Sequence, residues 1–403
     1  MSLAAREITL PQTERQARAD ETVRAEPTGR RDDPLLRAER YRPRTGLWPR
    51  IRSLPKRIFQ TVFRSAPYPT RPRLIVFGNA DRRSPVLVTT NYDLTVRRVC
   101  RALEGTDCYL LVAPASGIDV WCAAGGQRFN IDSIISILKT SRIAEMVDHR
   151  RLILPQLCAN GLNLFEVRRR TGWSAVFGPV DIADIPEYLH SRRRTEKMMR
   201  VTFTVRERLE MAVAMWGSLA LRYTLFPVLV FGLAVAPWFI GGLAVMAVAI
   251  SLGCFVIPGK TFVQKAGVGF FLPGTALILG ADGWLLGGGL GLFSLQWVLM
   301  LLLGSYLVGT SYPSYTPLWQ CGYSTLFYGF PHLKLEIIEE DCIGCNLCDH
   351  VCPVECFSPT ENKKMIFSNP DLCEGCQACL IQCPTDAIIN QVADEHQRLS
   401  QCQ

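Results

Sequence analysis

The sequence predicts three consecutive folds: an α/β domain, an α-helical transmembrane domain and a small α+β domain. Between residues 72 and 200, short apolar runs alternate with amphipathic stretches, which is typical of an α/β domain with a largely parallel sheet. Two long blocks, 211–259 and 266–310, are almost free of charge, as membrane-spanning helices are. Eight cysteines in two repeated groups then follow within residues 333–403.

The first 71 residues mix Arg, Glu, Asp and Pro without hydrophobic periodicity, and we expect them to form a disordered, arginine-rich arm. The sequence begins without an apolar segment, so it shows no recognisable signal peptide. The net charge of +8 comes largely from arginines before residue 210. Because these arginines adjoin an apolar block, they indicate membrane orientation and not a nucleic-acid-binding surface.

The region 72–200 contains the elements of the predicted α/β domain. Five short apolar runs are expected to be strands, at residues 74–77, 85–90, 108–112, 151–154 and 174–177. Four amphipathic stretches are expected to be helices, at residues 93–103, 131–147, 162–170 and 182–189.

The two apolar blocks are expected to make residues 201–315 a transmembrane domain. Arg222 is the only charged residue in the first block, and Asp282 is the only one in the second. Each block is about twice the ~20 residues that one crossing needs, so four helices are expected, or five if a glycine run adds a break. The arginines before the first span place that side in the cytoplasm. We therefore expect a multi-pass protein of the inner (cytoplasmic) membrane, with both flanking domains in the cytoplasm and residues 316–332 as a linker.

The cysteine-rich region, residues 333–403, carries a duplicated motif. Each group follows C-x2-C-x2-C-x3-C-P, and every member of the second group lies 31 residues after its mate in the first. In two-cluster ferredoxins the fourth cysteine of each motif ligates the other cluster. The predicted ligands of cluster 1 are Cys342, Cys345, Cys348 and Cys383, and those of cluster 2 are Cys373, Cys376, Cys379 and Cys352. A zinc ribbon is the alternative, but it uses two cysteine pairs. Iron–sulfur ligation needs free thiolates, which implies a reducing compartment.

A second motif, Ile118-Asp119-Val120-Trp121-Cys122-Ala123-Ala124-Gly125-Gly126, follows the third predicted strand. A cysteine among small residues is more often a buried small hydrophobe than a functional group. The small residues after Cys122 leave room for the backbone to approach a large flat cofactor. A thiolate in this position could ligate a metal.

This motif resembles the cap-helix motif Asn-Val/Ile-Trp-Cys-Ala-Ala/Gly-Gly-Lys of the corrinoid protein of bacterial mercury methylation. Further likeness lies in Ser84-Pro-Val-Leu-Val-Thr-Thr-Asn-Tyr92, Arg151-Leu-Ile-Leu-Pro-Gln156, Glu166-Val-Arg-Arg-Arg170 and Phe177-Gly-Pro-Val180. That family continues into a membrane domain, and its usual partner is a small two-cluster ferredoxin. The chain therefore resembles a natural fusion of the two proteins over residues 72–403.

The resemblance implies a Rossmann-like corrinoid-binding domain over residues 72–200. Cys122 would be the catalytic residue, the lower axial thiolate to cobalt, and the ferredoxin would reduce cobalt to Co(I). The protein tunes such a cofactor through the axial ligand. The implied corrinoid-binding residues are Cys122, Trp121, Asp119, Val120, Ala123, Ala124, Gly125, Thr90 and Asn91.

The implied reaction is methyl transfer from a methyl-folate, or its methyltransferase, to Hg(II). This chain has Asp119 where the motif has Asn and Gly126 where it has Lys. The partner family usually ends in a cysteine pair, whereas Cys402 is the only cysteine in residues 391–403. Because mercury is soft and prefers thiolates, Cys402 is a candidate mercury-binding thiol, with Cys356 and Cys321 as substitutes.

Two other functions remain open at this stage. The same corrinoid chemistry could serve another acceptor, either a different soft metal or metalloid or a one-carbon pathway. Alternatively, the chain could be a membrane-anchored electron-transfer protein whose α/β domain binds something other than a corrinoid. All three functions require an electron donor to the ferredoxin, and none requires nucleic acid.

Overall fold

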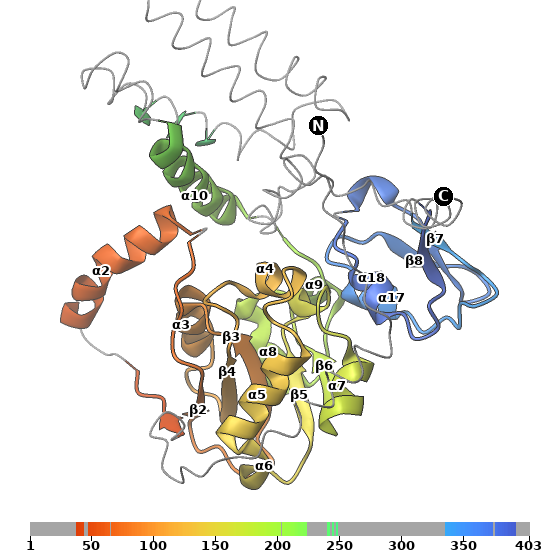
Figure 1. The fold of residues 1–403 in the computed structure, drawn as a ribbon, viewed down its shortest axis with the longest axis horizontal. Coiled ribbons are helices and arrows are strands. Elements are labelled where there is room, and N and C mark those ends of the chain that lie inside the picture. Colours follow the sequence, from red (N-terminus) through yellow and green to blue (C-terminus); the bar gives the residue numbers. More distant parts are fainter. Residues whose placement is uncertain are drawn as a thin grey trace, which may run out of the picture. The chain divides into compact units, whose positions relative to one another are not determined.

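The structure is a computed structural model that describes residues 38–43, 47–64, 66–202, 204–223, 240–241, 244–245, 247–248, 335–373 and 375–391. Its larger part is a mixed α/β domain (Figure 1). The chain order of its six strands is β1 (Glu39–Arg40), β2 (Arg73–Phe77), β3 (Val86–Thr90), β4 (Cys108–Ala113), β5 (Arg151–Leu154) and β6 (Ser174–Phe177).

The strands form one sheet in the order β1-β2-β4-β3-β5-β6. Strands β4, β3, β5 and β6 are mutually parallel, whereas β2 runs antiparallel to β4. The sheet is therefore largely parallel, as predicted. Parallel strands end at a common edge, and ligands in such sheets bind at the carboxyl ends of the strands.

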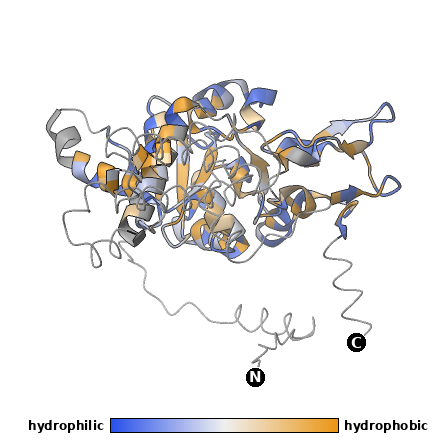
Figure 2. Cartoon of the chain, turned by 90° about the horizontal axis from the view of Figure 1, so that it is seen from above, coloured by the Kyte–Doolittle hydropathy of each residue, from blue (hydrophilic) through white to orange (hydrophobic). Residues whose placement is uncertain are grey.

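Helices cover both faces of this sheet. The main ones are α3 (Asp93–Ala102), α4 (Val120–Gly125), α5 (Ile131–Ser141), α6 (Ile143–Met146), α7 (Leu164–Thr171), α8 (Ile185–Ser191) and α9 (Glu196–Met199), with 3-10 turns η3 (Gln156–Cys158) and η4 (Ile182–Asp184). Alternate strand residues point to opposite faces. Leu111 thus joins a core with α4 and α5, whereas its neighbour Leu110 joins a second core with α3 and α8. Figure 2 shows the apolar stretches concentrated along the central sheet.

All five predicted strands are present, and their bounds agree to within one residue. The predicted helix at 131–147 is split into α5 and α6, because Arg142 adopts a left-handed conformation with φ of 51°. The predicted helix at 182–189 begins as the turn η4 and continues as α8.

The predicted disordered arm contains a helix, α2 (Leu47–Val62), that the sequence reading missed. Pro55 lies inside this helix, and three arginines and a lysine interrupt its apolar residues, which is why we expected no regular structure there. The helix contacts α10 (Val205–Tyr223): a Cβ atom on Gly217 would lie 2.3 Å from the carbonyl oxygen of Val62. Residues 1–37 lie outside the described residues.

The predicted transmembrane domain is contradicted. Within the part of the chain that the structure describes, no helix is both long enough and apolar enough to cross a membrane. The first predicted span begins inside α10, whose 19 residues include charged side chains near both ends, such as Glu207 and Arg222. This finding overturns the transmembrane part of the predicted fold class and the inner-membrane localisation that depended on it. Apart from residues 240–241, 244–245 and 247–248, the rest of both apolar blocks and the linker lie outside the described residues.

The C-terminal region forms a small α+β unit. Strand β7 (Leu335–Ile337) pairs antiparallel with β10 (Ile388–Asn390), and β8 (Phe357–Pro359) pairs antiparallel with β9 (Met365–Phe367). Two short helices, α17 (Leu347–Val351) and α18 (Ala378–Gln382), pack against each other, and the turn η8 (Pro370–Leu372) precedes the second cysteine motif.

Candidate functional site

The Trp–Cys motif forms the short helix α4 beyond the carboxyl end of β4. Asp119 is its N-cap: the Oδ1 atom accepts a hydrogen bond of 3.0 Å from the backbone N–H of Cys122. Asp and Asn are equally good at this position. The replacement of the motif's Asn by Asp119 therefore preserves the local structure that starts the helix.

Asn91 holds the loop that leads into α4. Its Oδ1 atom accepts hydrogen bonds from the backbone N–H groups of Ala115 and Gly117, each 2.9 Å long. Its Nδ2 group donates to the carbonyl oxygen of Thr70 at 3.0 Å. Asn91 is 6% exposed, so its buried side chain fixes the loop that leads into the motif.

The small residues of α4 pack against the loop after η3. Ala123 and Ala124 are fully buried in the core. A Cβ atom on Gly161 would lie 2.3 Å from the carbonyl oxygen of Ala124, and one on Gly125 would lie 3.0 Å from Nδ2 of Asn160. Small side chains are thus required for this close packing, whether or not they also contact a corrinoid, which stays a prediction.

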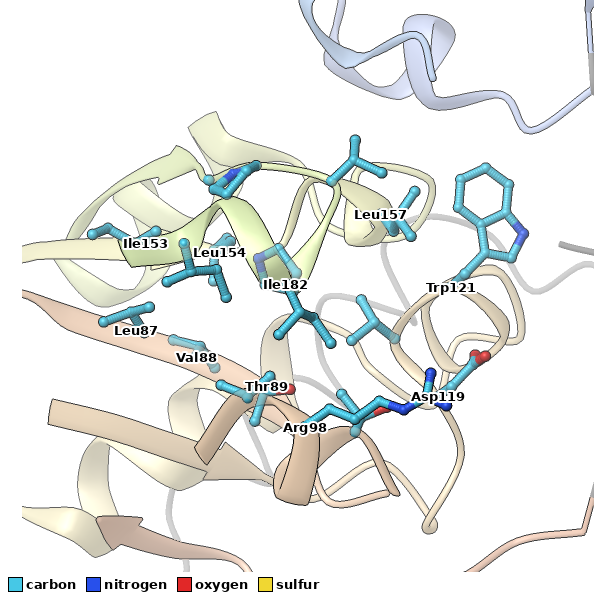
Figure 3. Close-up of a pocket in the computed structure, with 18 of the residues that line it drawn as sticks. Leu87, Val88, Thr89, Arg98, Asp119, Trp121, Ile153, Leu154, Leu157 and Ile182 are labelled. Atoms are coloured by element: carbon cyan, nitrogen blue, oxygen red, sulfur yellow. The ribbon is translucent and has the colours of Figure 1, made fainter. Parts of the chain in front are cut away.

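A pocket of about 1000 Å³, including its open mouth, lies between α4 and the carboxyl ends of β3 and β5. Figure 3 shows Leu87, Val88, Ile153 and Leu154 on the side of the sheet, with Trp121 on the side of α4. Its lining is therefore mostly apolar, with few charged groups, which is the usual character of a cofactor site.

The charged groups of the pocket are Arg64, Arg98 and Asp119. Arg98 pairs with Glu210 of α10 at 2.6 Å, and Arg64 lies 3.9 Å from the same carboxylate. Nε of Arg64 is buried without a hydrogen-bond partner among the described residues. Buried polar atoms are normally satisfied, so this atom fits a site completed by a polar ligand.

The structure places three of the nine predicted corrinoid residues, Asp119, Val120 and Trp121, in the lining of this pocket. The other six do not belong to the lining, so their contact with a corrinoid stays a prediction: Cys122, Ala123, Ala124, Gly125, Thr90 and Asn91. Cys122 is partly buried on the same helix, one residue beyond the indole of Trp121. Sequence reasoning missed Arg64, whose position before the first strand gave no signal, and Arg98 on α3.

The four predicted ligands of cluster 1 line a single cavity. Cys342, Cys345, Cys348 and Cys383 surround it together with Ala387. The fourth cysteine comes from the second motif, so the geometry agrees with crossed ligation. Among the described residues, no three candidate side chains lie close enough together to hold a single metal ion.

The predicted ligands of cluster 2 form a second group. The buried thiol of Cys379 interacts electrostatically with Cys376, Cys373 and Cys352, and burial raises its pKa well above the usual value. A fifth cysteine, Cys356, is 1% exposed and forms thiol hydrogen bonds with Cys352 and Cys373. These hydrogen bonds lower the pKa of Cys352 and the pKa of Cys373 to about 7.

The iron–sulfur unit is hydrogen-bonded to the α/β domain through Gln382. Its Nε2 group donates to the carbonyl oxygens of Ala159, at 2.9 Å, and Leu162, at 2.7 Å. Its Oε1 atom accepts from the backbone N–H of Leu164 at 3.2 Å. Asn163 also donates to the carbonyl oxygen of Ile381. Gln382 is fully buried, and the loop that it holds is the one that packs under α4.

Arg200 makes a second link, beside cluster 2. Its guanidinium donates to the carbonyl oxygens of Asp349 and Cys352, each at 2.7 Å, and pairs with the Asp349 carboxylate at 2.6 Å. The side chains of this pair are 10% and 18% exposed. Val201 adds a backbone hydrogen bond of 2.9 Å to Pro353. Neither Gln382 nor Arg200 was predicted to connect the domains.

Comparisons with known proteins agree with this division of the chain. Residues 57–189 match the family described as CO dehydrogenase/acetyl-CoA synthase delta subunit, and residues 341–388 match the 4Fe-4S dicluster domain family. The acetyl-CoA decarbonylase/synthase complex subunit gamma of Methanopyrus kandleri is 34% identical over 125 residues, which is 30% of this chain and 27% of that protein.

Two other relatives match a similar share of the chain. The gamma subunit of Methanocaldococcus jannaschii is 32% identical over 136 residues, covering 33% of this chain and 27% of that protein. The corrinoid/iron-sulfur protein large subunit of Moorella thermoacetica is 29% identical over 121 residues, covering 30% and 27%. The chain thus spans about a quarter of the length of the curated relatives that it matches.

These matches confirm both predicted cofactor classes, a corrinoid and 4Fe–4S clusters. They relate the α/β domain to proteins of corrinoid-linked methyl transfer, several of which are subunits of larger complexes. The chain therefore combines, in one polypeptide, a segment similar to corrinoid/iron–sulfur proteins with a 4Fe–4S dicluster domain.

Proposed function

We propose that this chain is a corrinoid-dependent methyltransferase whose own ferredoxin domain supplies the reducing electrons, and that its methyl acceptor is inorganic mercury(II). The observation that carries the proposal is α4. This helix extends Trp121 into the pocket and has Cys122 beside it, and it rests on the loop that Gln382 of the iron–sulfur unit holds. One structural connection therefore joins the candidate cobalt ligand to the candidate reductant.

A bound corrinoid would supply a cobalt centre that accepts a methyl group when reduced and then transfers it. The chain's contribution is to bind and tune this cofactor. Trp121 and the apolar ends of β3 and β5 would cover the macrocycle, and Arg64 and Arg98 would meet its polar periphery. Cys122 would hold the cobalt through its thiolate, and the hydrogen bond that its backbone N–H donates to Asp119 fixes the start of its helix.

Thiolate ligation is the feature that favours mercury(II). A thiolate ligand is electron-rich, so it would favour transfer of a methyl group together with its bonding electrons, and mercury(II) accepts such a carbanion-like group. Mercury is also a soft metal that prefers thiolate ligands. The candidate mercury thiols Cys321 and Cys402 lie outside the described residues. A methyl-folate, or the enzyme that carries it, is the proposed methyl donor.

The cofactor role of Cys122 can be tested by spectroscopy. The full chain, purified without oxygen, would be titrated with a corrinoid and its visible spectrum recorded. We expect a spectrum of thiolate-bound, base-off corrinoid that is lost in Cys122→Ala. The matched control is Cys158→Ala, since Cys158 is fully buried in the core beside the same loop. An identical spectrum in Cys122→Ala and wild type would refute thiolate ligation.

The acceptor can be tested separately. The chain would be expressed in an anaerobe that does not methylate mercury, then supplied with Hg(II) and assayed for methylmercury. Product that depends on Cys122 is the expected result. No product from a strain with confirmed corrinoid loading and eight irons per chain would refute mercury as the acceptor.

A second candidate function is corrinoid-dependent methyl transfer in a one-carbon pathway. It is favoured by the relatives, which are subunits of acetyl-CoA decarbonylase/synthase complexes. The two candidates share the same pocket and differ in the acceptor. Methyl transfer from the loaded chain to an acetyl-CoA synthase, with no transfer to Hg(II), would select this alternative.

A further inference from the structure

The iron–sulfur unit is an internal duplication in structure as well as in sequence. Helices α17 and α18 are related by the same 31-residue offset as the cysteines. The residue before each helix is left-handed, with φ of 60° at Asn346 and 62° at Gln377. A second left-handed pair follows each motif, with φ of 58° at Glu355 and 53° at Asp386. Each residue of one half therefore has a structural counterpart that serves as an internal reference.

Cys356 breaks this symmetry beside cluster 2. Its counterpart, 31 residues later, is Ala387. Ala387 is 2% exposed and lines the cavity that the four predicted ligands of cluster 1 surround. Cys356 is 1% exposed, so it occupies an equally enclosed position. The site of cluster 1 therefore has a methyl group at the position where the site of cluster 2 has a thiol.

Cys356 contacts the predicted ligands of cluster 2. Its backbone N–H donates a hydrogen bond of 3.4 Å to the sulfur of Cys352, and its thiol lies close to the sulfurs of Cys352 and Cys373. The crossed-ligation rule assigns both of these partners to cluster 2. Cys356 therefore contacts ligands contributed by both motifs.

We propose that the thiol of Cys356 donates a hydrogen bond to the ligand sulfurs of cluster 2, which makes cluster 2 easier to reduce than cluster 1. Reduction adds negative charge to a cluster that is already anionic, and a donor to its sulfurs stabilises the added charge. Hydrogen bonds to the sulfurs are among the factors that set cluster potentials.

The location of cluster 2 in the fold determines which way electrons would move between the two clusters. Cys376, a ligand of cluster 2, packs against the core of the α/β domain, whereas its counterpart Cys345, a ligand of cluster 1, is exposed. Electrons from an external donor would reach cluster 1 and be held at cluster 2, on the side of the α/β domain. Cys356 is in this sense a tuning residue, which acts through the ligands that it contacts.

The test is an anaerobic redox titration of the full chain, followed by electron paramagnetic resonance. We expect Cys356→Ala to lower one of the two midpoint potentials by about 59 mV, which is a tenfold change in a one-electron equilibrium constant. The other midpoint should not move. The reciprocal variant Ala387→Cys should raise that second midpoint, and the double variant should restore a difference with the clusters exchanged.

Iron content decides between tuning and ligation. Cys356→Ala should retain eight irons per chain, and a loss of four would show that Cys356 is itself a ligand, which would overturn the proposal. Unchanged midpoints in both single variants would also overturn it. If the Cys356→Ala variant does not assemble its clusters, the Ala387→Cys variant alone still tests the proposal. This inference rests only on the ferredoxin part of the proposed function. The titration needs no corrinoid, so its failure and a failure of methyl transfer are distinguishable.

Discussion

Replacing Gln382 with leucine is expected to release the iron–sulfur unit from the loop that supports α4. Leucine approximates the bulk of glutamine but cannot make its three hydrogen bonds. Two carbonyl oxygens and one N–H group of residues 159–164 would then remain buried without partners. Each hydrogen bond contributes about 1 kcal/mol net, so the expected loss is about 3 kcal/mol in the free energy of local opening.

A loss of about 3 kcal/mol corresponds to about a hundredfold change in the opening equilibrium. Amide hydrogen exchange measures this equilibrium segment by segment. It suits this chain better than global unfolding, because a protein of several domains with clusters is not expected to unfold in two states. Exchange at residues 159–164 of the iron-loaded Gln382→Leu variant should therefore be about a hundredfold faster than in wild type.

The matched control is Gln391→Leu. Gln391 is an exposed glutamine of the same unit, and its side chain bonds to the exposed Glu336. Changes at such surface positions are usually within about 0.5 kcal/mol, so exchange at 159–164 should be unaffected. Equal exchange in Gln382→Leu and wild type, with eight irons in both, would refute the conclusion that Gln382 holds the two domains together.

Other substitutions test the helix and the second link. Asp119→Ala removes the N-cap of α4 and should cost about 1 kcal/mol, whereas Asp119→Asn should be silent; amide exchange at Cys122 separates them. Gly161→Ala places a carbon 2.3 Å from the carbonyl oxygen of Ala124. This should displace α4 and weaken corrinoid binding in a spectral titration, and unchanged binding would exclude α4 from the site. Arg200→Met leaves the partly buried Asp349 carboxylate and two carbonyl oxygens without their donor and should cost about 3 kcal/mol. Exchange at residues 349–353 should report this loss, with partial recovery in Arg200→Lys.

The strands of the α/β domain were predictable because burial on both faces requires continuous apolar runs. Helix boundaries were less so, since the left-handed Arg142 that divides α5 from α6 has no marker in the sequence. Helix α2 was missed because Pro55 and the arginines concealed its pattern. The membrane interpretation relied on hydropathy. The first apolar block begins inside α10, and this described helix combines apolar residues with charged ones.

The candidate site was partly predictable. The cysteine spacing predicted the 4Fe–4S dicluster domain that the family match confirms, because ligands of a cluster must recur at fixed intervals. The Trp–Cys motif identified α4, but its neighbours depend on tertiary structure. Arg64 comes from a segment that was expected to be disordered, and it reaches the pocket because α2 precedes an ordered turn. Such a contact between distant segments leaves no periodic signal in the sequence.

Comparison of the two halves of the duplication reveals differences in surroundings that neither cysteine motif reveals alone. Because the two halves share a backbone, a difference between counterparts reflects surroundings and not local fold. Gln382 occupies the position of Val351, and it is the residue that bonds to the loop under α4. Cys376 occupies the position of the exposed Cys345, and it packs on the α/β core. Cys356 replaces an alanine beside the same cluster to which Cys376 belongs. These departures together would distinguish a domain-facing cluster from a solvent-facing one, as the proposed electron transfer to the α/β domain would require.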